Sequence, residues 1–134
     1  MTAIGTIRIV AALIRDHAGR VVLVRKRGTQ AFMQPGGKLD AGEDDITALS
    51  REISEELGCV LDPASVLPLG AFDAVAANEP GFRVKANLYR VDVTGEILPS
   101  REIDEAIWVD PASPPDIHLA PLTRDHVLPL ASRG

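Results

Sequence analysis

The chain has 134 residues, of which 46% are hydrophobic and 25% are charged, and its formal net charge is −5. A chain of this length suits one hydrophobic core, so we expect a single domain over residues 1–134. The acidic balance argues against binding duplex DNA or RNA by phosphate neutralisation, so an anionic ligand would need a bound cation or a local basic cluster.

The first elements are predicted to form a β-hairpin. The segment Thr6 to Arg15 is rich in Ile, Val and Ala, and Arg20 to Arg25 reads Arg-Val-Val-Leu-Val-Arg. Asp16 to Gly19 supplies turn residues between them, so the two strands should pair. A loop from Gly28 to Gly42 is expected to follow.

The segment Asp44 to Leu57 has a helical pattern. Four apolar residues fall on one stripe at 100° per residue: Ile46, Leu49, Ile53 and Leu57. Asp44 and Asp45 lie in the first turn, where the helix dipole favours anions, and Gly58 provides a C-terminal stop. This pattern predicts the best-defined helix of the chain.

The C-terminal half alternates strand patterns with irregular segments. Phe82 to Tyr89 alternates apolar and polar residues, as a half-buried strand does. Val66 to Val75 and Ala106 to Val109 are further strand candidates. The prolines of Pro111 to Pro129 keep most of that region irregular, with a short helix expected near Thr123 to Leu128. The order of elements predicts an α+β fold.

Three carboxylates are crowded onto about one turn of the predicted helix. Glu52 and Glu56 are four residues apart, and Glu55 follows Glu52 by three. Their mutual repulsion weakens the helix unless a divalent cation binds them. Oxygen ligands without neighbouring Cys or paired His favour Mg²⁺, with Mn²⁺ as a substitute, over Zn²⁺. Such a site suits hydrolysis of a phosphoanhydride, because the cation offsets phosphate charge and acidifies a bound water.

The residues before the helix fit the same chemistry. Gly36 and Gly37 allow backbone N–H groups to approach an anion. Glu43 and Arg51 have the charges and positions to pair, which would tie the loop to the helix and hold the carboxylates in place.

The stretch from Gly37 to Cys59 resembles the Nudix box, G-x5-E-x7-R-E-U-x-E-E-x-G-U, in which U is aliphatic. The one departure is Cys59 at an aliphatic position, and a buried cysteine behaves as a small hydrophobe. A chance match has a probability on the order of 10⁻¹⁰ per starting position. The resemblance implies a MutT-like Nudix hydrolase, an α/β/α sandwich in which helices flank a mixed β-sheet.

The resemblance also implies roles for individual residues. Glu52, Glu55 and Glu56 would be metal ligands, supported by the Glu43–Arg51 ion pair.

The catalytic base varies within the family and comes either from the box or from a later loop. Glu102, six residues before Trp108, resembles such a loop glutamate, and Glu105 competes with it.

Phosphate-binding groups are predicted on both sides of the glycines. The Gly37 backbone would shape the site, and the basic side chains that are candidates for substrate phosphates are Arg25, Lys26, Arg27 and Lys38. Charged strand ends and loops are also commonly just solvated, so both interpretations stay open for these residues.

The predicted function is hydrolysis of a nucleoside di- or triphosphate or a related diphosphate compound, with a nucleotide-binding regulatory module as the alternative. Within the family, ADP-ribose hydrolases resemble one another in a proline, and diadenosine-polyphosphate hydrolases in a tyrosine, at places that fall among Asp73 to Ala77. Neither residue occurs there. A MutT-like nucleotide hydrolase remains, acting as a monomer or homodimer.

The remaining features indicate the compartment. Cys59 is the only cysteine, which excludes an internal disulfide and favours the cytoplasm. The segment Met1 to Val10 lacks signal-peptide features, and the longest apolar runs, such as Ile9 to Ile14, are too short to span a bilayer. No membrane association is expected.

Overall fold

Strand β1 (Gly5–Leu13) lies inside a mixed four-stranded sheet in the computed structural model, which describes residues 4–133. The strand order is β4-β1-β7-β6, where β4 is Gly36–Lys38, β7 is Phe82–Arg90 and β6 is Leu67–Val75. β1 runs parallel to β7 and antiparallel to β4, and β6 runs antiparallel to β7. The sheet is therefore mixed, as predicted.

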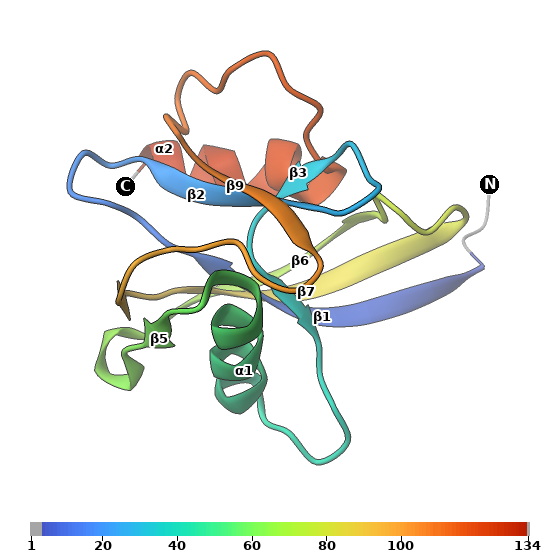
Figure 1. Cartoon of the computed structure of the whole chain (residues 1–134). Helices are drawn as coiled ribbons and strands as arrows, with labels where there is room; N and C mark the ends of the chain where they lie inside the picture. The colour runs from blue at the N-terminus through green and yellow to red at the C-terminus, as the bar shows by residue number, and fades with distance from the viewer. Residues whose placement is uncertain (1–3, 134) are drawn as a thin grey trace.

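Helices cover the strands from two sides (Figure 1). The first is α1 (Asp45–Leu57), and the second is formed by a π-helical turn η2 (Thr123–Val127) that continues into α2 (Leu128–Arg133). A short 3-10 turn, η1 (Pro63–Ser65), follows α1 in the chain. Among residues 4–133, none of the helices has the length and apolar character to cross a membrane.

Both faces of the second half of β1, from Val10 to Leu13, are buried, which explains the continuous apolar run there. Val10 and Ala12 pack in one core cluster with α1, whereas Ala11 and Leu13 pack in a second cluster with η2 and α2. Successive side chains of a strand point to opposite faces, so a strand covered on both sides must be apolar at every position. The predicted α/β/α sandwich is confirmed.

The predicted hairpin is wrong, although both of its strands exist. β2 (Val21–Lys26) belongs to a separate antiparallel sheet of order β3-β2-β9, with β3 at Phe32–Met33 and β9 at Ile103–Val109. The two predicted segments meet in a short antiparallel stretch beside the turn, where a bridge joins Arg15 to Val21 and the Val22 N–H donates to the Ile14 carbonyl. A period of two marks a strand but not its partner, and each strand has a longer partner elsewhere in the chain.

The segment predicted as a loop contains the short strands β3 and β4. β4 packs so closely on β1 that a Cβ at Gly36 would lie 2.2 Å from the Val10 carbonyl oxygen. Gly36 also has φ of 150°, which L side chains rarely adopt. The glycine is therefore what lets β4 pair with β1 at this edge of the sheet.

The predicted stop of α1 at Gly58 and the acidic residue Asp45 in its first turn are confirmed, whereas Asp44 lies at the N-cap, one residue before the helix. The Asp44 side chain accepts a hydrogen bond from the Thr47 N–H, and Gly58 ends the helix at φ 68° with its N–H bonded to the Ser54 carbonyl. Three residues of the apolar stripe, Leu49, Ile53 and Leu57, are fully buried, and the fourth, Ile46, is partly buried. This burial fixes the rotation of α1 and so fixes where its glutamates lie.

The later predictions hold with changed boundaries. β6 and β7 occupy the predicted positions, and β9 begins at Ile103, before the predicted start at Ala106. The predicted C-terminal helix extends past Leu128 through α2, which continues η2 without a break although it contains Pro129. A two-stranded pair, β5 (Val60–Leu61) with β8 (Val93–Thr94), completes the set.

Candidate active site

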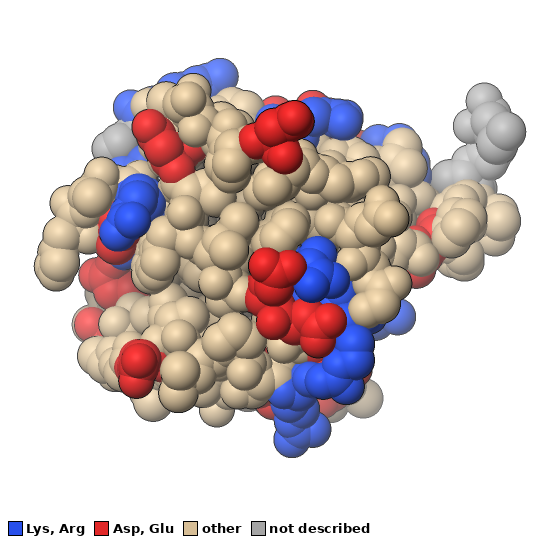
Figure 2. All heavy atoms as spheres, turned by 45° about the horizontal axis from the view of Figure 1, so that its top comes forward, with Lys and Arg blue, Asp and Glu red and all other residues tan. Residues whose placement is uncertain are grey.

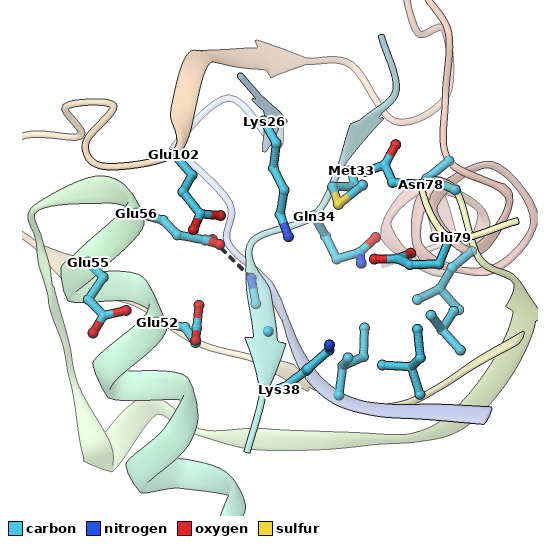
Figure 3. Close-up of a pocket in the computed structure, with 18 of the residues that line it drawn as sticks. Lys26, Met33, Gln34, Lys38, Glu52, Glu55, Glu56, Asn78, Glu79 and Glu102 are labelled. Carbon is cyan, nitrogen blue, oxygen red and sulfur yellow. Dashed lines mark hydrogen bonds between the residues drawn. The ribbon is translucent and has the colours of Figure 1, made fainter. Parts of the chain in front are cut away.

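A cavity of about 410 Å³ wraps around the edge strand β4. Figure 3 shows β4 running through the middle of this pocket, with Glu52, Glu55, Glu56 and Glu102 on one side. Three labelled polar residues lie on the other side: Gln34, Asn78 and Glu79. We call these two sides the acidic half and the amide half.

Glu56 is the most buried member of the acidic half. Its residue is 8% exposed, and its Oε1 atom accepts a hydrogen bond from the Gly36 N–H at 3.2 Å. Burial raises the pKa of its carboxyl to about 8, and the negative charges of Glu52 and Glu102 act in the same direction. An ionised Glu56 therefore needs a cation nearby.

Glu52 lies against the glycine strand. Its carboxylate accepts a hydrogen bond from Arg51 Nη1 at 2.8 Å, and a Cβ at position 37 would stand 2.5 Å from its carboxyl carbon. Burial raises the pKa of Glu52, against the opposing effect of Arg51. Only glycine at position 37 leaves this carboxylate its place beside β4.

The predicted ion pair between Glu43 and Arg51 is confirmed. Arg51 donates from Nε and Nη2 to the two carboxylate oxygens of Glu43, each at 2.8 Å, and from Nη2 to the Lys38 carbonyl at 3.1 Å. The Asp40 N–H donates to Glu43 at 2.7 Å. The hydrogen bonds from Arg51 lower the pKa of Glu43 to about 2. Arg51 therefore links the loop, β4 and Glu52.

The two remaining carboxylates border the pocket from different elements. The Glu55 side chain is 35% exposed, and its Oε2 atom lies 3.5 Å from Arg51 Nη1. Glu102 precedes β9, and Figure 3 shows its carboxylate pointing toward Glu56. Tertiary folding thus adds a fourth glutamate to the three of α1.

The acidic half has the donor chemistry of a site for a hard cation. Its side-chain donors are carboxylate oxygens, and neither Cys nor His lines the pocket in the described chain. Within residues 4–133, no three acidic, His or Cys side chains already converge into a closed metal-binding set. An open set fits Mg²⁺, which takes few protein carboxylates and keeps water or phosphate oxygens in its other positions.

Two of the four predicted basic residues reach the pocket. Lys26 and Lys38 line it. Arg25 and Arg27 do not, and this corrects their prediction as ligand-binding residues.

Both arginines are held by partners outside the pocket. Arg25 donates to the Glu105 carboxylate at 2.7 Å, and Arg27 donates to the Arg101 carbonyl at 2.9 Å. Glu105 forms this ion pair with Arg25 and does not line the pocket, unlike Glu102. Lys26 is the last residue of β2 and follows a register shift in the pairing of β2 with β9, which lies between Arg25 and Lys26. On the face that Figure 2 shows, acidic and basic atoms lie beside one another without a continuous basic surface.

The amide half was missed from the sequence. Gln34 is 6% exposed and accepts a hydrogen bond from Thr123 of η2, although 89 positions separate the two residues. A polar residue next to the Pro-Gly-Gly turn was the one available signal for Gln34. Asn78 and Glu79 lie in the turn between β6 and β7, and turn residues are polar whether or not they bind a ligand.

Fold and site together define a Nudix-type domain, and the comparisons with known proteins agree. The NUDIX domain profile matches residues 5–130, so the chain belongs to the Nudix family. The crystal structure of a MutT NUDIX hydrolase from Burkholderia pseudomallei has a similar fold, with a TM-score of 0.74 at 24% identity over 96% of both chains.

Two curated relatives match a shorter segment. The 8-oxo-dGTP diphosphatase of Haemophilus influenzae is 43% identical over 58 residues, which cover 40% of this chain and 43% of that protein. The RNA pyrophosphohydrolase of Halorhodospira halophila is 40% identical over 62 residues, which cover 46% of this chain and 33% of that protein. The matched segments thus span less than half of each relative.

Proposed function

We propose that the protein is a Mg²⁺-dependent pyrophosphohydrolase that cleaves a phosphoanhydride bond in a nucleoside di- or triphosphate or a related nucleoside diphosphate derivative. The observation that carries the proposal is the acidic half, where Glu52, Glu55, Glu56 and Glu102 border one end of a pocket. The names of the two curated relatives, a nucleotide diphosphatase and an RNA pyrophosphohydrolase, support this reaction class.

The metal would be held by Glu52 and Glu56, with Glu55 as the more exposed third ligand. When bound, Mg²⁺ supplies charge neutralisation on the phosphate oxygens and acidifies a coordinated water; Mn²⁺ is the expected substitute. Burial raises the pKa of Glu56 to about 8, so a bound cation would be needed to keep this carboxylate ionised at neutral pH. Arg51 acts as a positioning residue, because it holds Glu52 and Glu43 together.

Lys26 and Lys38 are the proposed phosphate contacts, since both line the pocket next to the carboxylates. The proton of the attacking water would pass to a carboxylate. Glu55 and Glu102 are the two candidates for this base, because both border the pocket and neither is as deeply buried as Glu56.

The deciding experiment is a hydrolysis assay of the purified protein with Mg²⁺ or Mn²⁺. The panel contains nucleoside di- and triphosphates, 8-oxo-dGTP and a 5′-triphosphorylated RNA, with identification of phosphate and pyrophosphate as products. We expect turnover of at least one nucleotide and a loss of about 100-fold or more in Glu56→Gln. Glu105→Gln, whose carboxylate lies outside the pocket, is the matched control.

Two results would overturn the proposal. If the wild-type protein hydrolyses no compound of the panel and the Glu56→Gln substitution does not change this result, the enzyme assignment is wrong. Tight nucleotide binding without turnover at saturating metal favours the regulatory module instead. A single domain over residues 1–134, a small-molecule partner, a monomeric or homodimeric state and a cytoplasmic location remain predictions.

A further inference from the structure

The turn that carries Glu102 contains a strained residue. Arg101 has φ of 57°, and it is the one non-glycine residue with positive φ among residues 4–133. The Ile103 N–H donates to the Ser100 carbonyl at 3.1 Å, so Arg101 and Glu102 are the two central residues of a β-turn. A positive φ at the first central position favours Gly, Asn or Asp, because it costs free energy for other side chains. This turn therefore needs support from neighbouring elements.

Backbone hydrogen bonds support the turn on the side of α1. The Leu98 N–H donates to the Leu57 carbonyl at 2.8 Å, and the Ser100 N–H donates to the Glu56 carbonyl at 2.9 Å. These carbonyls belong to the last turn of the helix, where no helical N–H is available to them. The segment before Arg101 is thus attached to the residue that carries the most buried carboxylate of the acidic half.

Arg27 supports the turn on the other side. Its Nη2 atom donates to the Arg101 carbonyl at 2.9 Å, and its backbone N–H donates to the Glu102 carbonyl at 2.6 Å. A third contact, from Nε of Arg27 to Asp104, is long at 3.4 Å, and the Arg27 side chain is 71% exposed, so this ion pair contributes little. The side chain of Arg27 therefore acts mainly on the Arg101 carbonyl.

The orientation of that carbonyl influences where the Glu102 side chain points. The Arg101 carbonyl and the Glu102 N–H lie in one rigid peptide plane, so a hydrogen bond that holds the carbonyl also restricts φ of Glu102. Glu102 lines the pocket, and Figure 3 shows its carboxylate directed toward Glu56. The negative charge of Glu102 is close enough to contribute to the raised pKa of Glu56.

We propose that Arg27 is a positioning residue, whose hydrogen bond to the Arg101 carbonyl holds the turn so that the Glu102 carboxylate stays beside Glu56. The inference rests on the proposed function in assigning a cation to the acidic half. Arg27 does not line the pocket, and it acts only through Glu102.

The test measures the affinity of the purified protein for Mn²⁺ by titration calorimetry, without nucleotide. Arg27→Ala should raise the Kd for Mn²⁺ about 10-fold, because a carboxylate next to the cation loses its fixed place. Charge alone predicts the opposite sign, since removal of a positive charge favours cation binding to an acidic cluster. Weaker binding in Arg27→Ala therefore reports on the placement of Glu102 and not on charge.

A double-mutant cycle with Glu102→Gln shows whether Arg27 acts through Glu102. Once the carboxylate is removed, Arg27→Ala should change the Kd for Mn²⁺ by less than about 2-fold. A role of Arg27 in general stability would add the same loss in both backgrounds, and thermal unfolding measures the stability of each variant. With Mg²⁺ and a hydrolysed nucleotide, kcat should follow the same cycle, while KM for the nucleotide changes by less than about 3-fold.

Two variants control for the other contacts of this region. Arg25→Ala removes the neighbouring arginine of β2, which bonds the Glu105 side chain. Asp104→Ala removes the long contact of Arg27 and leaves its hydrogen bond to the Arg101 carbonyl. Neither substitution should weaken Mn²⁺ binding by more than about 2-fold.

The outcomes separate this inference from the proposed function. An unchanged or lower Kd in Arg27→Ala overturns the inference, and so does an equal increase of Kd with and without the Glu102 carboxylate. Either result in a protein that hydrolyses nucleotides overturns the inference alone. Weaker Mn²⁺ binding that depends on Glu102, in a protein that hydrolyses no nucleotide, supports the inference and contradicts only the proposed function. A wild-type protein that binds no Mn²⁺ contradicts both.

Discussion

The carboxylate of Glu52 occupies the space that a side chain at Gly37 would need. A Cβ built on Gly37 lies 2.5 Å from the carboxyl carbon of Glu52 and 2.6 Å from its Oε2 atom. Glycine is therefore needed at position 37 because the Glu52 carboxylate fills the space of a side chain. Its backbone conformation is not the reason, since Gly37 is not in the left-handed region. This contact sets the distance between α1 and β4 at the proposed metal site.

Gly37→Ala should lower kcat strongly while changing stability little. The added methyl group displaces the far end of a flexible side chain, which folding tolerates, but the displaced carboxylate no longer meets the cation correctly. We expect kcat to fall about 100-fold, as a misplacement of about 1 Å does in other enzymes, and steady-state kinetics with urea unfolding will measure both effects. Gly28→Ala, at a position with open space but with φ of 76°, should lower stability through backbone strain and retain kcat. Equal losses of kcat in the two variants would contradict this prediction.

Arg51→Lys should weaken catalysis through Glu52. A lysine cannot reproduce the planar set of donors that reaches both oxygens of Glu43 and one oxygen of Glu52. We expect kcat to fall about 10- to 100-fold with a smaller change in KM for nucleotide. The Mg²⁺ concentration for half-maximal rate should rise, a change that general destabilisation would not produce.

The same substitution gives a prediction about acid stability. The pKa of Glu43 is lowered from 4.5 to about 2 in the folded protein, so its ion pair stabilises the protein above pH 4.5 and this contribution is lost as the pH falls toward 2. Wild-type protein should therefore be more stable than Arg51→Lys at pH 7, and the difference should shrink by pH 2.5. Urea unfolding at both pH values measures this, with Arg124→Lys as the control for an exposed arginine.

Glu56→Gln should stabilise the metal-free protein at neutral pH. The folded pKa of about 8 exceeds the ordinary 4.5, so the folded state retains a proton that the unfolded state releases, and wild-type stability falls as the pH rises from 4.5 to 8. Glutamine removes this dependence, worth about 3 kcal/mol at pH 7 by the linkage relation. In melting experiments with chelator, the variant should unfold roughly 5 °C or more above wild type at pH 7.5 and close to it at pH 4.5.

Added Mg²⁺ should reverse the order of these two proteins. A cation that binds ionised Glu56 stabilises the wild-type fold, whereas a neutral amide offers a poorer ligand. Millimolar Mg²⁺ should raise the wild-type melting temperature more than that of Glu56→Gln. Identical shifts in the two proteins would show that Glu56 does not contact the cation.

Glu102→Gln and Glu105→Gln should differ in kinetics although the residues are neighbours in sequence. Glu102 borders the pocket, and Glu105 forms an ion pair with Arg25 outside it. We expect Glu102→Gln to lower kcat about 10²- to 10⁴-fold if Glu102 is the base, and to lose the acidic limb of the kcat profile against pH. An intact limb in Glu102→Gln with a lost limb in Glu55→Gln assigns the base to Glu55.

The sequence by itself determined the features that depend on residues close together in the chain. The helix Asp45–Leu57 and its stop at Gly58 follow from spacing, because helix periodicity and helix termination act within a few residues. The Glu43–Arg51 pair, whose members are eight residues apart, was predicted from their charges and their places in the box. The strands β1, β6 and β7 likewise follow from local apolar patterns. The prediction of a sandwich with a mixed sheet came from the resemblance that these local residues carry.

Tertiary structure decided which of several similar residues reach the pocket and which strands pair. The local sequence pattern does not predict which of Glu102 and Glu105 reaches the pocket, and it does not predict the contact between Gln34 and Thr123. Strand pairing and helix packing between distant parts of the chain determine these contacts. The hairpin prediction was wrong for the same reason. Spacing along the chain fixes which face a side chain occupies, but only the folded arrangement fixes what that face meets.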